Sequence, residues 1–233
     1  MSSQNGLGSI SDPARMAGGL QPVRGLILVG WLLAAAGYWG PWIAHPTAGL
    51  VLSGIDMAEF VKFLPGALDG SLFVIRQLFY LPPFAVVATV AFLIGSRRLR
   101  FPWWLRGLAV VLALPVSLHM LPPAWSPASL RSPEFRLQTL ALVGSWLLLA
   151  GFWLWARLPS WLTGSLAAVL SLAAVLLPTW QLLVVKPAID TVYGTPPPIG
   201  WGFYVCIVGL LLLAVGGGWF VRQSRARRRG ATL

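Results

Sequence analysis

Six runs of apolar residues alternate with short polar segments along this chain. A membrane-spanning helix needs about 20 predominantly apolar residues, because each residue adds about 1.5 Å and the hydrocarbon core is about 30 Å thick. The runs cover residues 25–44, 72–95, 106–121, 137–156, 161–183 and 200–221. The hydrophobic pattern therefore predicts an all-α fold, a polytopic transmembrane helical bundle of about six spans over residues 23–221.

The two ends of the chain lie outside this bundle. Residues 1–22 contain many Ser and Gly and show no apolar periodicity, so we expect a flexible tail. Residues 222–233 form a basic tail, in which five arginines follow the last span. We interpret this tail as an anchor for topology that contacts membrane lipids, because such clusters attract anionic head groups at about 1 kcal/mol per charge.

Composition supports a membrane protein and excludes an ordinary soluble enzyme. Hydrophobic residues make up 57% of the chain and charged residues 10%, whereas soluble domains average about 25% charged residues. The 17 Lys and Arg against 6 Asp and Glu give a net charge of +11. In a polytopic membrane protein such a surplus follows from the enrichment of Lys and Arg on the cytoplasmic side. We therefore expect no nucleic-acid partner.

The distribution of charge predicts the orientation of the six spans. If the N-terminus is cytoplasmic, twelve of the Lys and Arg lie in cytoplasmic segments, and five lie on the other side with five of the six acids. This asymmetry satisfies the positive-inside rule. We therefore expect a bacterial inner-membrane protein with both termini in the cytoplasm.

The first outer loop, residues 45–71, contains a short amphipathic helix at 56–64. Its apolar positions recur with helical spacing, Asp56 and Glu59 resemble a capping box, and Pro65 ends the pattern. The apolar stripe is expected to lie on the bilayer surface, on the bundle or on a partner protein. The candidate interaction residues of this helix are Asp56, Met57, Glu59, Phe60, Lys62 and Leu64.

A few polar residues fall inside or at the ends of the second and third spans. They are Arg76, Gln77, Tyr80 and His119. Arg76 lies about 6 Å into its predicted helix, judged by the helical rise. It has three alternatives: it reaches the head groups by snorkelling, it pairs with Asp69 or Glu59, or it contacts a substrate or partner.

The sequence contains no motif for catalysis or for a cofactor. His45, His119, Asp56 and Glu59 form the one candidate acid–base or ligand set, and they come from separate segments. Metal sites typically contain pairs of His or Cys residues that lie close together in the sequence, and this chain has no such pair. We therefore expect no cofactor, no metal and no catalytic residue, with an intramembrane enzyme based on that set as a minor alternative.

The residues from Gly40 to Pro65 resemble a family of uncharacterised small bacterial membrane proteins, some of which accompany ABC transporter components. The resemblance covers the first outer loop and the adjoining helix ends, about a tenth of the chain. It implies an accessory role in the membrane, with the loop as an interaction surface and components of an ABC transporter among the partners. It supplies no catalytic residue.

Two functions follow as expectations. The first is a non-catalytic accessory or structural subunit of a larger membrane complex, which contacts partner subunits through its transmembrane helices and the first outer loop. The alternative is a small transporter or channel with a site around the second and third spans, which Pro82, Pro83 and Pro115 interrupt. Irregular polar helices at membrane depth are where transporters bind their substrates.

Overall fold

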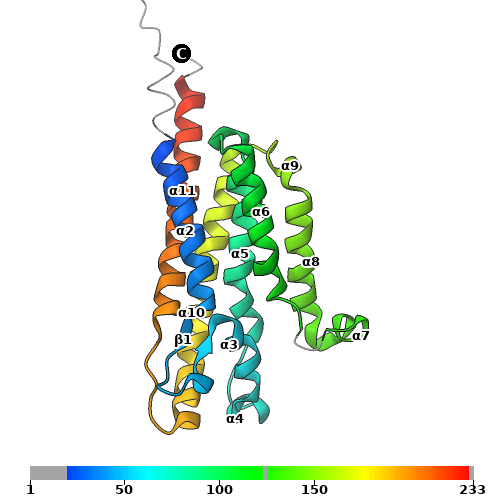
Figure 1. The fold of residues 1–233 in the computed structure, drawn as a ribbon, viewed down its shortest axis with the longest axis vertical. Coiled ribbons are helices and arrows are strands. Elements are labelled where there is room, and N and C mark those ends of the chain that lie inside the picture. Colours follow the sequence, from blue (N-terminus) through cyan, green and yellow to red (C-terminus); the bar gives the residue numbers. More distant parts are fainter. Residues whose placement is uncertain (1–19, 123–124, 231–233) are drawn as a thin grey trace, which may run out of the picture.

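The computed structural model describes residues 20–122 and 125–230, with only the backbone of residue 48 and of residues 227–230. The described chain is almost entirely helical and contains one small hairpin (Figure 1). The all-α prediction is therefore confirmed. Most of the tail expected over residues 1–22 lies outside the described residues, and so do the last three residues of the basic tail.

The long helices form an upright bundle and the short elements lie mainly at its ends (Figure 1). The long helices are α2 (Gln21–Trp39), α5 (Leu81–Thr89), α6 (Trp103–Leu118), α8 (Arg136–Ala150), α10 (Ser160–Tyr193) and α11 (Trp201–Gly230). The short elements are β1 (Pro41–Ile43), η1 (Ala48–Leu50), β2 (Leu52–Ser53), α3 (Gly54–Phe60), η2 (Val61–Phe63), α4 (Pro65–Leu68), η3 (Arg76–Tyr80), η4 (Val90–Ile94), η5 (Arg97–Leu99), α7 (Pro127–Arg131), η6 (Pro133–Phe135) and α9 (Phe152–Trp155). We call the end with β1, β2, α3 and α4 the hairpin end, and the opposite end, with η5 and the C-terminal part of α11, the arginine end.

Each of the six apolar runs forms helix, but only four helical stretches in the described chain are long and apolar enough to cross a membrane. They are Gln21–Trp39, Arg76–Ile94, Ser160–Tyr193 and Trp201–Ala226. Helices α6 and α8 have 16 and 15 residues, which correspond to about 24 and 23 Å of rise. Helix α8 ends early because the chain turns at Gly151 before it continues as α9.

The second apolar run is not one continuous α-helix. Residues 72–75 are not helical, η3 is a 3-10 helix, α5 is α-helical and η4 is a π-helical turn. The first turn of α5 contains Pro82 and Pro83, where a missing N–H costs no hydrogen bond. The amide of Gln181 on α10 satisfies the non-helical segment, accepting from the N–H of Ile75 at 3.0 Å and donating to the carbonyl of Phe73 at 3.2 Å.

Helix α10 is longer than the sequence indicated. The predicted span ends at residue 183, whereas the helix continues to Tyr193. Lys186 and Asp190, one turn apart in this extension, form an ion pair on the helix surface. The Tyr193 hydroxyl donates to the carbonyl of Leu50 at 2.6 Å and so joins the helix end to the first loop.

Helices α2 and α11 pack with their backbones in contact. A Cβ added to Gly37 would lie 2.2 Å from the backbone nitrogen of Cys206, and one added to Gly209 would lie 2.2 Å from the nitrogen of Ala34. Only glycine permits this approach, and small residues are typical of helix contacts in membranes. The seven-residue spacing of Gly30 and Gly37 places both glycines on one face of α2.

The three successive glycines of α11 face in different directions. A Cβ on Gly216 would meet Ile27 of α2 at 3.0 Å, and one on Gly217 would meet the carbonyl of Gly164 on α10 at 2.7 Å, whereas Gly218 faces open space. Close helix packing is therefore present at two of the three positions. Helix α11 lies between α2 and α10 as a result.

We expect Gly209→Ala to destabilise the protein, because the added methyl group would displace backbone atoms of α2. The cost of such overpacking is about 1–3 kcal/mol. The matched control is Gly218→Ala in the same helix, where the space is open and where alanine favours a helix by up to about 1 kcal/mol. Thermal unfolding in detergent measures both variants. Equal transition temperatures for the two would contradict the packing described here.

Candidate functional site

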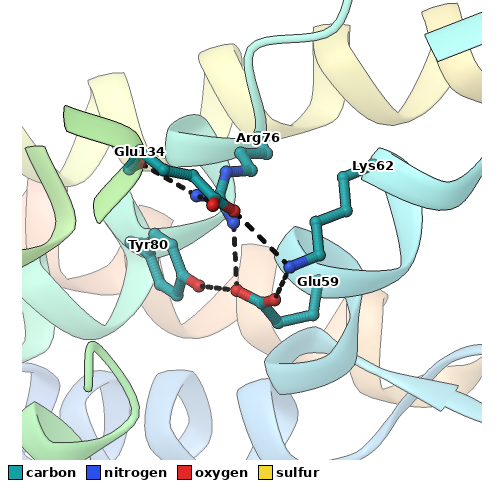
Figure 2. Close-up of polar contacts among 5 residues, drawn as sticks. All are labelled: Glu59, Lys62, Arg76, Tyr80 and Glu134. Atoms are coloured by element: carbon teal, nitrogen blue, oxygen red, sulfur yellow. Dashed lines mark hydrogen bonds and ion pairs between the residues drawn. The ribbon is translucent and has the colours of Figure 1, made fainter. Parts of the chain in front are cut away.

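Arg76 occupies the centre of a polar network at the hairpin end. It is the first residue of η3 and is only 8% exposed. Its Nη1 lies 3.2 Å from Oε1 of Glu59, and its Nη2 donates to the carbonyl of Glu134 at 2.9 Å and lies 3.4 Å from Oε1 of the same residue. Figure 2 shows the guanidinium between the two acids.

The carboxylate of Glu59 receives two further partners. The Tyr80 hydroxyl donates to its Oε1 at 3.1 Å, and the Lys62 ammonium lies 2.6 Å from its Oε2 (Figure 2). Lys62 also lies 3.7 Å from Oε1 of Glu134. Both cations face the ring of Phe135, with Arg76 at 5.1 Å and Lys62 at 5.8 Å from its centroid. We call Glu59, Lys62, Arg76, Tyr80 and Glu134 the Arg76 network.

The Arg76 network joins segments that are distant in the sequence. Glu59 comes from α3, Lys62 from η2, Arg76 and Tyr80 from η3, and Glu134 from η6. Two acids balance two bases, so the network carries no net formal charge at neutral pH. An arrangement of this kind fixes the first loop and the start of α8 against the bundle, because each partner would otherwise be left as an uncompensated charge in a partly buried site.

The structure shows the second of the three alternatives for Arg76, which is pairing. Glu59 is its partner, whereas Asp69 is not. Hydrogen bonds from the side chain and the backbone N–H of Ser71 hold the pKa of the Asp69 carboxyl below its usual value. The interpretation that Arg76 snorkels to the head groups is wrong, because its guanidinium pairs inside the protein.

Glu134 is the member of the network that sequence reasoning missed. The segment Ser132-Pro133-Glu134 predicts a helix start, and η6 does begin there, with Pro133 in its first turn. The sequence does place Glu134 and Arg76 near the same predicted membrane surface, and this shared position is the one indication that they could pair. The pairing itself depends on which helices are neighbours, and the sequence does not contain that information in a local pattern.

The predicted amphipathic helix exists but begins earlier and ends sooner. Its α-helical part is Gly54–Phe60, and the capping interaction joins Ser53 and Asp56, with the Ser53 N–H donating to Asp56 Oδ2 at 2.9 Å. The box predicted from Asp56 and Glu59 is therefore wrong by three residues. Glu59 is free of a capping role and pairs with Arg76 instead.

The apolar stripe of this helix faces the bundle itself. Met57 and Leu64 are 0% and 1% exposed, and Phe60 is half-buried with its ring 6.4 Å from that of Tyr193. Of the candidate interaction residues, these three are therefore packed within the chain. The large apolar side chains that this loop exposes are Leu50 at 47%, Phe63 at 66% and Leu68 at 71%, of which the last two are the most exposed.

His119 lies at the end of α6 and contacts α2. Its Nε2 accepts from Nε1 of Trp39 at 2.8 Å, so the proton lies on Nδ1, which is 3.2 Å from the carbonyl of Val116. His45 bonds elsewhere, accepting from the N–H of Thr47. Gln77 is half-buried on η3. In the described part of the chain, no three His, Cys, Asp or Glu residues are grouped as metal ligands.

Helix α8 carries polar groups that have no partner. Gln138 is 2% exposed and Ser145 is fully buried, and neither side chain makes a hydrogen bond within the described residues. The two residues are seven apart and share the buried face of the helix with Leu142 and Leu149. This face packs against α5 and α6. A buried polar group without a hydrogen-bond partner lowers the stability of the fold. Gln138 and Ser145 are therefore unusual among the buried residues of α8.

We expect a strong coupling between Arg76 and Glu59. A double-mutant cycle with Arg76→Gln and Glu59→Gln should give a coupling free energy of about 1–3 kcal/mol in chemical or thermal unfolding, because the pair is in contact and largely buried. The control cycle uses Lys62→Gln and Glu134→Gln, whose atoms are 3.7 Å apart with Glu134 57% exposed, and should give at most about 0.5 kcal/mol. Equal couplings would show that Arg76 is not the centre of the network.

The first loop thus combines a buried apolar stripe, a neutral ion-pair network and exposed apolar side chains. Its resemblance to small bacterial membrane proteins that accompany ABC transporter components stays a prediction. Comparisons with protein-family models, curated proteins and solved structures find no match to this chain.

Proposed function

We propose that this protein spans a bacterial inner membrane six times, with both termini in the cytoplasm. Four long apolar helices support the membrane setting. The two shorter helices expose large apolar side chains along one face, as lipid-facing helices do, among them Val111, Leu140 and Leu147. Short helical turns flank α8, because η6 precedes it directly and α9 follows it after the turn at Gly151. The hairpin end is then the outer side.

Labelling of single cysteines tests this topology in intact cells. The native Cys206 is 1% exposed, so it contributes little to the reactive surface. A Cys206→Ser background removes this thiol, and only the introduced cysteines can then react. We expect Leu130→Cys and Asp190→Cys to react with a membrane-impermeant maleimide, and Arg97→Cys to react only after the cells are opened. Protection of residue 130 or residue 190 in intact cells would overturn the six-span arrangement.

We propose further that the protein is a non-catalytic accessory subunit of a larger membrane complex. The observation that carries the proposal is the construction of the first loop. The Arg76 network and the buried Met57 hold this loop in one conformation, and on it Phe63 and Leu68 are exposed to 66% and 71%. A fixed platform that presents large apolar side chains loses little conformational entropy when a partner binds.

Co-purification in mild detergent tests the accessory role. We expect the wild-type protein to retain a membrane-protein partner in fixed stoichiometry, and the double variant Phe63→Ser/Leu68→Ser to lose it at least tenfold, since central apolar contacts typically contribute more than about 1 kcal/mol each. Trp125→Ser is the matched control, because Trp125 is 67% exposed and lies in the next loop of the hairpin end. Wild-type protein that purifies without any partner would overturn the proposal.

A small transporter is the second candidate, and the unpartnered polar groups of α8 favour it. Gln138 and Ser145 lie on the buried face of α8, a helix that contacts η3, α5 and η4 of the irregular segment, and irregular backbone with polar neighbours is typical of substrate sites in membrane proteins.

Gln138→Leu separates the two candidates. The variant should raise the unfolding temperature in either case, since it removes a buried group without a partner. If the wild-type protein alone moves a solute into liposomes and Gln138→Leu abolishes this flux while remaining folded, the transporter is favoured over the accessory subunit.

A further inference from the structure

Cavities gather at the arginine end of the bundle. One, of about 250 Å³, is lined by Arg98, Ser160, Trp161, Ser224 and Arg225. A second, of about 440 Å³, is lined by residues of α11 from Gly218 to Ala226 and shares Arg225 with the first. They lie where α10 begins and α11 approaches its end, at the top of Figure 1. We call the first of them the arginine pocket.

The arginines of this pocket form no ion pair with any carboxylate among the described residues. Every ion pair among the described residues involves Glu59, Glu134 or Asp190, which all belong to the hairpin end. Arg98 and Arg225 are both exposed and come from different elements, η5 and α11. Two unpaired guanidinium groups on the wall of one cavity favour an anion there, because each forms charge-assisted hydrogen bonds with phosphate oxygens.

The floor of the pocket supplies further donors. Ser160 is the first residue of α10 and is 3% exposed, and its hydroxyl makes no hydrogen bond among the described residues. The first turn of α10 contains no acidic residue, so the positive end of the helix dipole is not compensated by the helix itself. The buried hydroxyl and the helix start add to the charge of Arg98 and Arg225.

We propose that the arginine pocket binds the phosphate group of an anionic phospholipid. The inference depends on the membrane setting proposed above and on no partner protein. Basic pockets between transmembrane helices on the cytoplasmic side are typical sites for anionic lipid head groups. At about 30 Å³ for a water-sized group, the 250 Å³ of the pocket accommodates a phosphate together with part of a glycerol head group.

The apolar and aromatic side chains next to the pocket favour a lipid over free phosphate as its ligand. Trp161 lines it and is 43% exposed, and tryptophan is enriched where helices meet lipid head groups. Further along α10, Leu166 and Val169 are exposed to 42% and 66%. These side chains give an acyl chain an apolar surface that continues from the head-group site into the membrane.

Native mass spectrometry from lipid-free detergent, titrated with phosphatidylglycerol or phosphatidylcholine, tests the proposal. We expect the full-length wild-type protein to bind one phosphatidylglycerol at least tenfold more tightly than phosphatidylcholine. The variant Arg98→Gln/Arg225→Gln should weaken this binding about tenfold, as expected for the loss of two head-group contacts. Both residues are exposed, and unfolding temperatures measured without lipid confirm that each variant is folded.

The matched control is Arg97→Gln/Arg157→Gln, which removes the same charge from the same end. Arg97 is the exposed neighbour of Arg98, and Arg157 stacks over Trp153; neither lines the arginine pocket. We expect this control to weaken binding less than threefold.

Equal losses in the two variants, or equal affinity for the two lipids, would overturn the site. Displacement of the lipid by millimolar inorganic phosphate would overturn the lipid assignment in favour of free phosphate. Cysteine labelling and co-purification are measured independently, so failure of this proposal is distinguishable from failure of the proposed function.

Discussion

The contact between α11 and its two neighbours is the constraint on which the rest of the bundle depends. In a bilayer, helices gain little from burying apolar side chains against each other, so close packing of the backbones must hold them together. Glycines provide it: Gly37 of α2 and Gly209 of α11 lie in the contact between these two helices, and Gly217 of α11 lies against α10. These three helices form a rigid frame on one side of the molecule, and the irregular segment 72–94 lies against it (Figure 1).

The frame makes the irregular segment possible, because side chains from it satisfy carbonyl groups of that segment. Gln181 on α10 bonds to Phe73, Tyr38 on α2 donates to the carbonyl of Phe79, and Trp31 donates to that of Val86. In the proposed membrane setting, non-helical backbone requires such partners, since water is absent at membrane depth. The same segment contains Arg76, so the backbone bonds and the Arg76 network together fix the position of the first loop.

Local sequence patterns predicted where the helices lie. Features that depend on contacts between distant segments could not be predicted in this way. The six apolar runs and the helix near Asp56 follow from hydrophobic spacing alone. The break at residues 72–75 does not, because it depends on Gln181, more than a hundred residues away. Glu134 is likewise recognisable as a helix-start residue but not as the partner of Arg76. The extension of α10 to Tyr193 depends on its contact with Leu50 in another segment.

The two ends of the bundle differ in whether carboxylates of the protein pair with their cationic side chains. At the hairpin end both cations of the Arg76 network have a carboxylate within 4 Å, so the network is neutral. At the arginine end no described carboxylate pairs with Arg98 or Arg225. Repulsion among these cations destabilises the folded bundle unless anions from outside compensate them. The phosphate layer of a membrane is such a source. In the proposed orientation the charge asymmetry would then also stabilise the fold, because the bilayer would supply anions at the end where no described carboxylate pairs with these arginines.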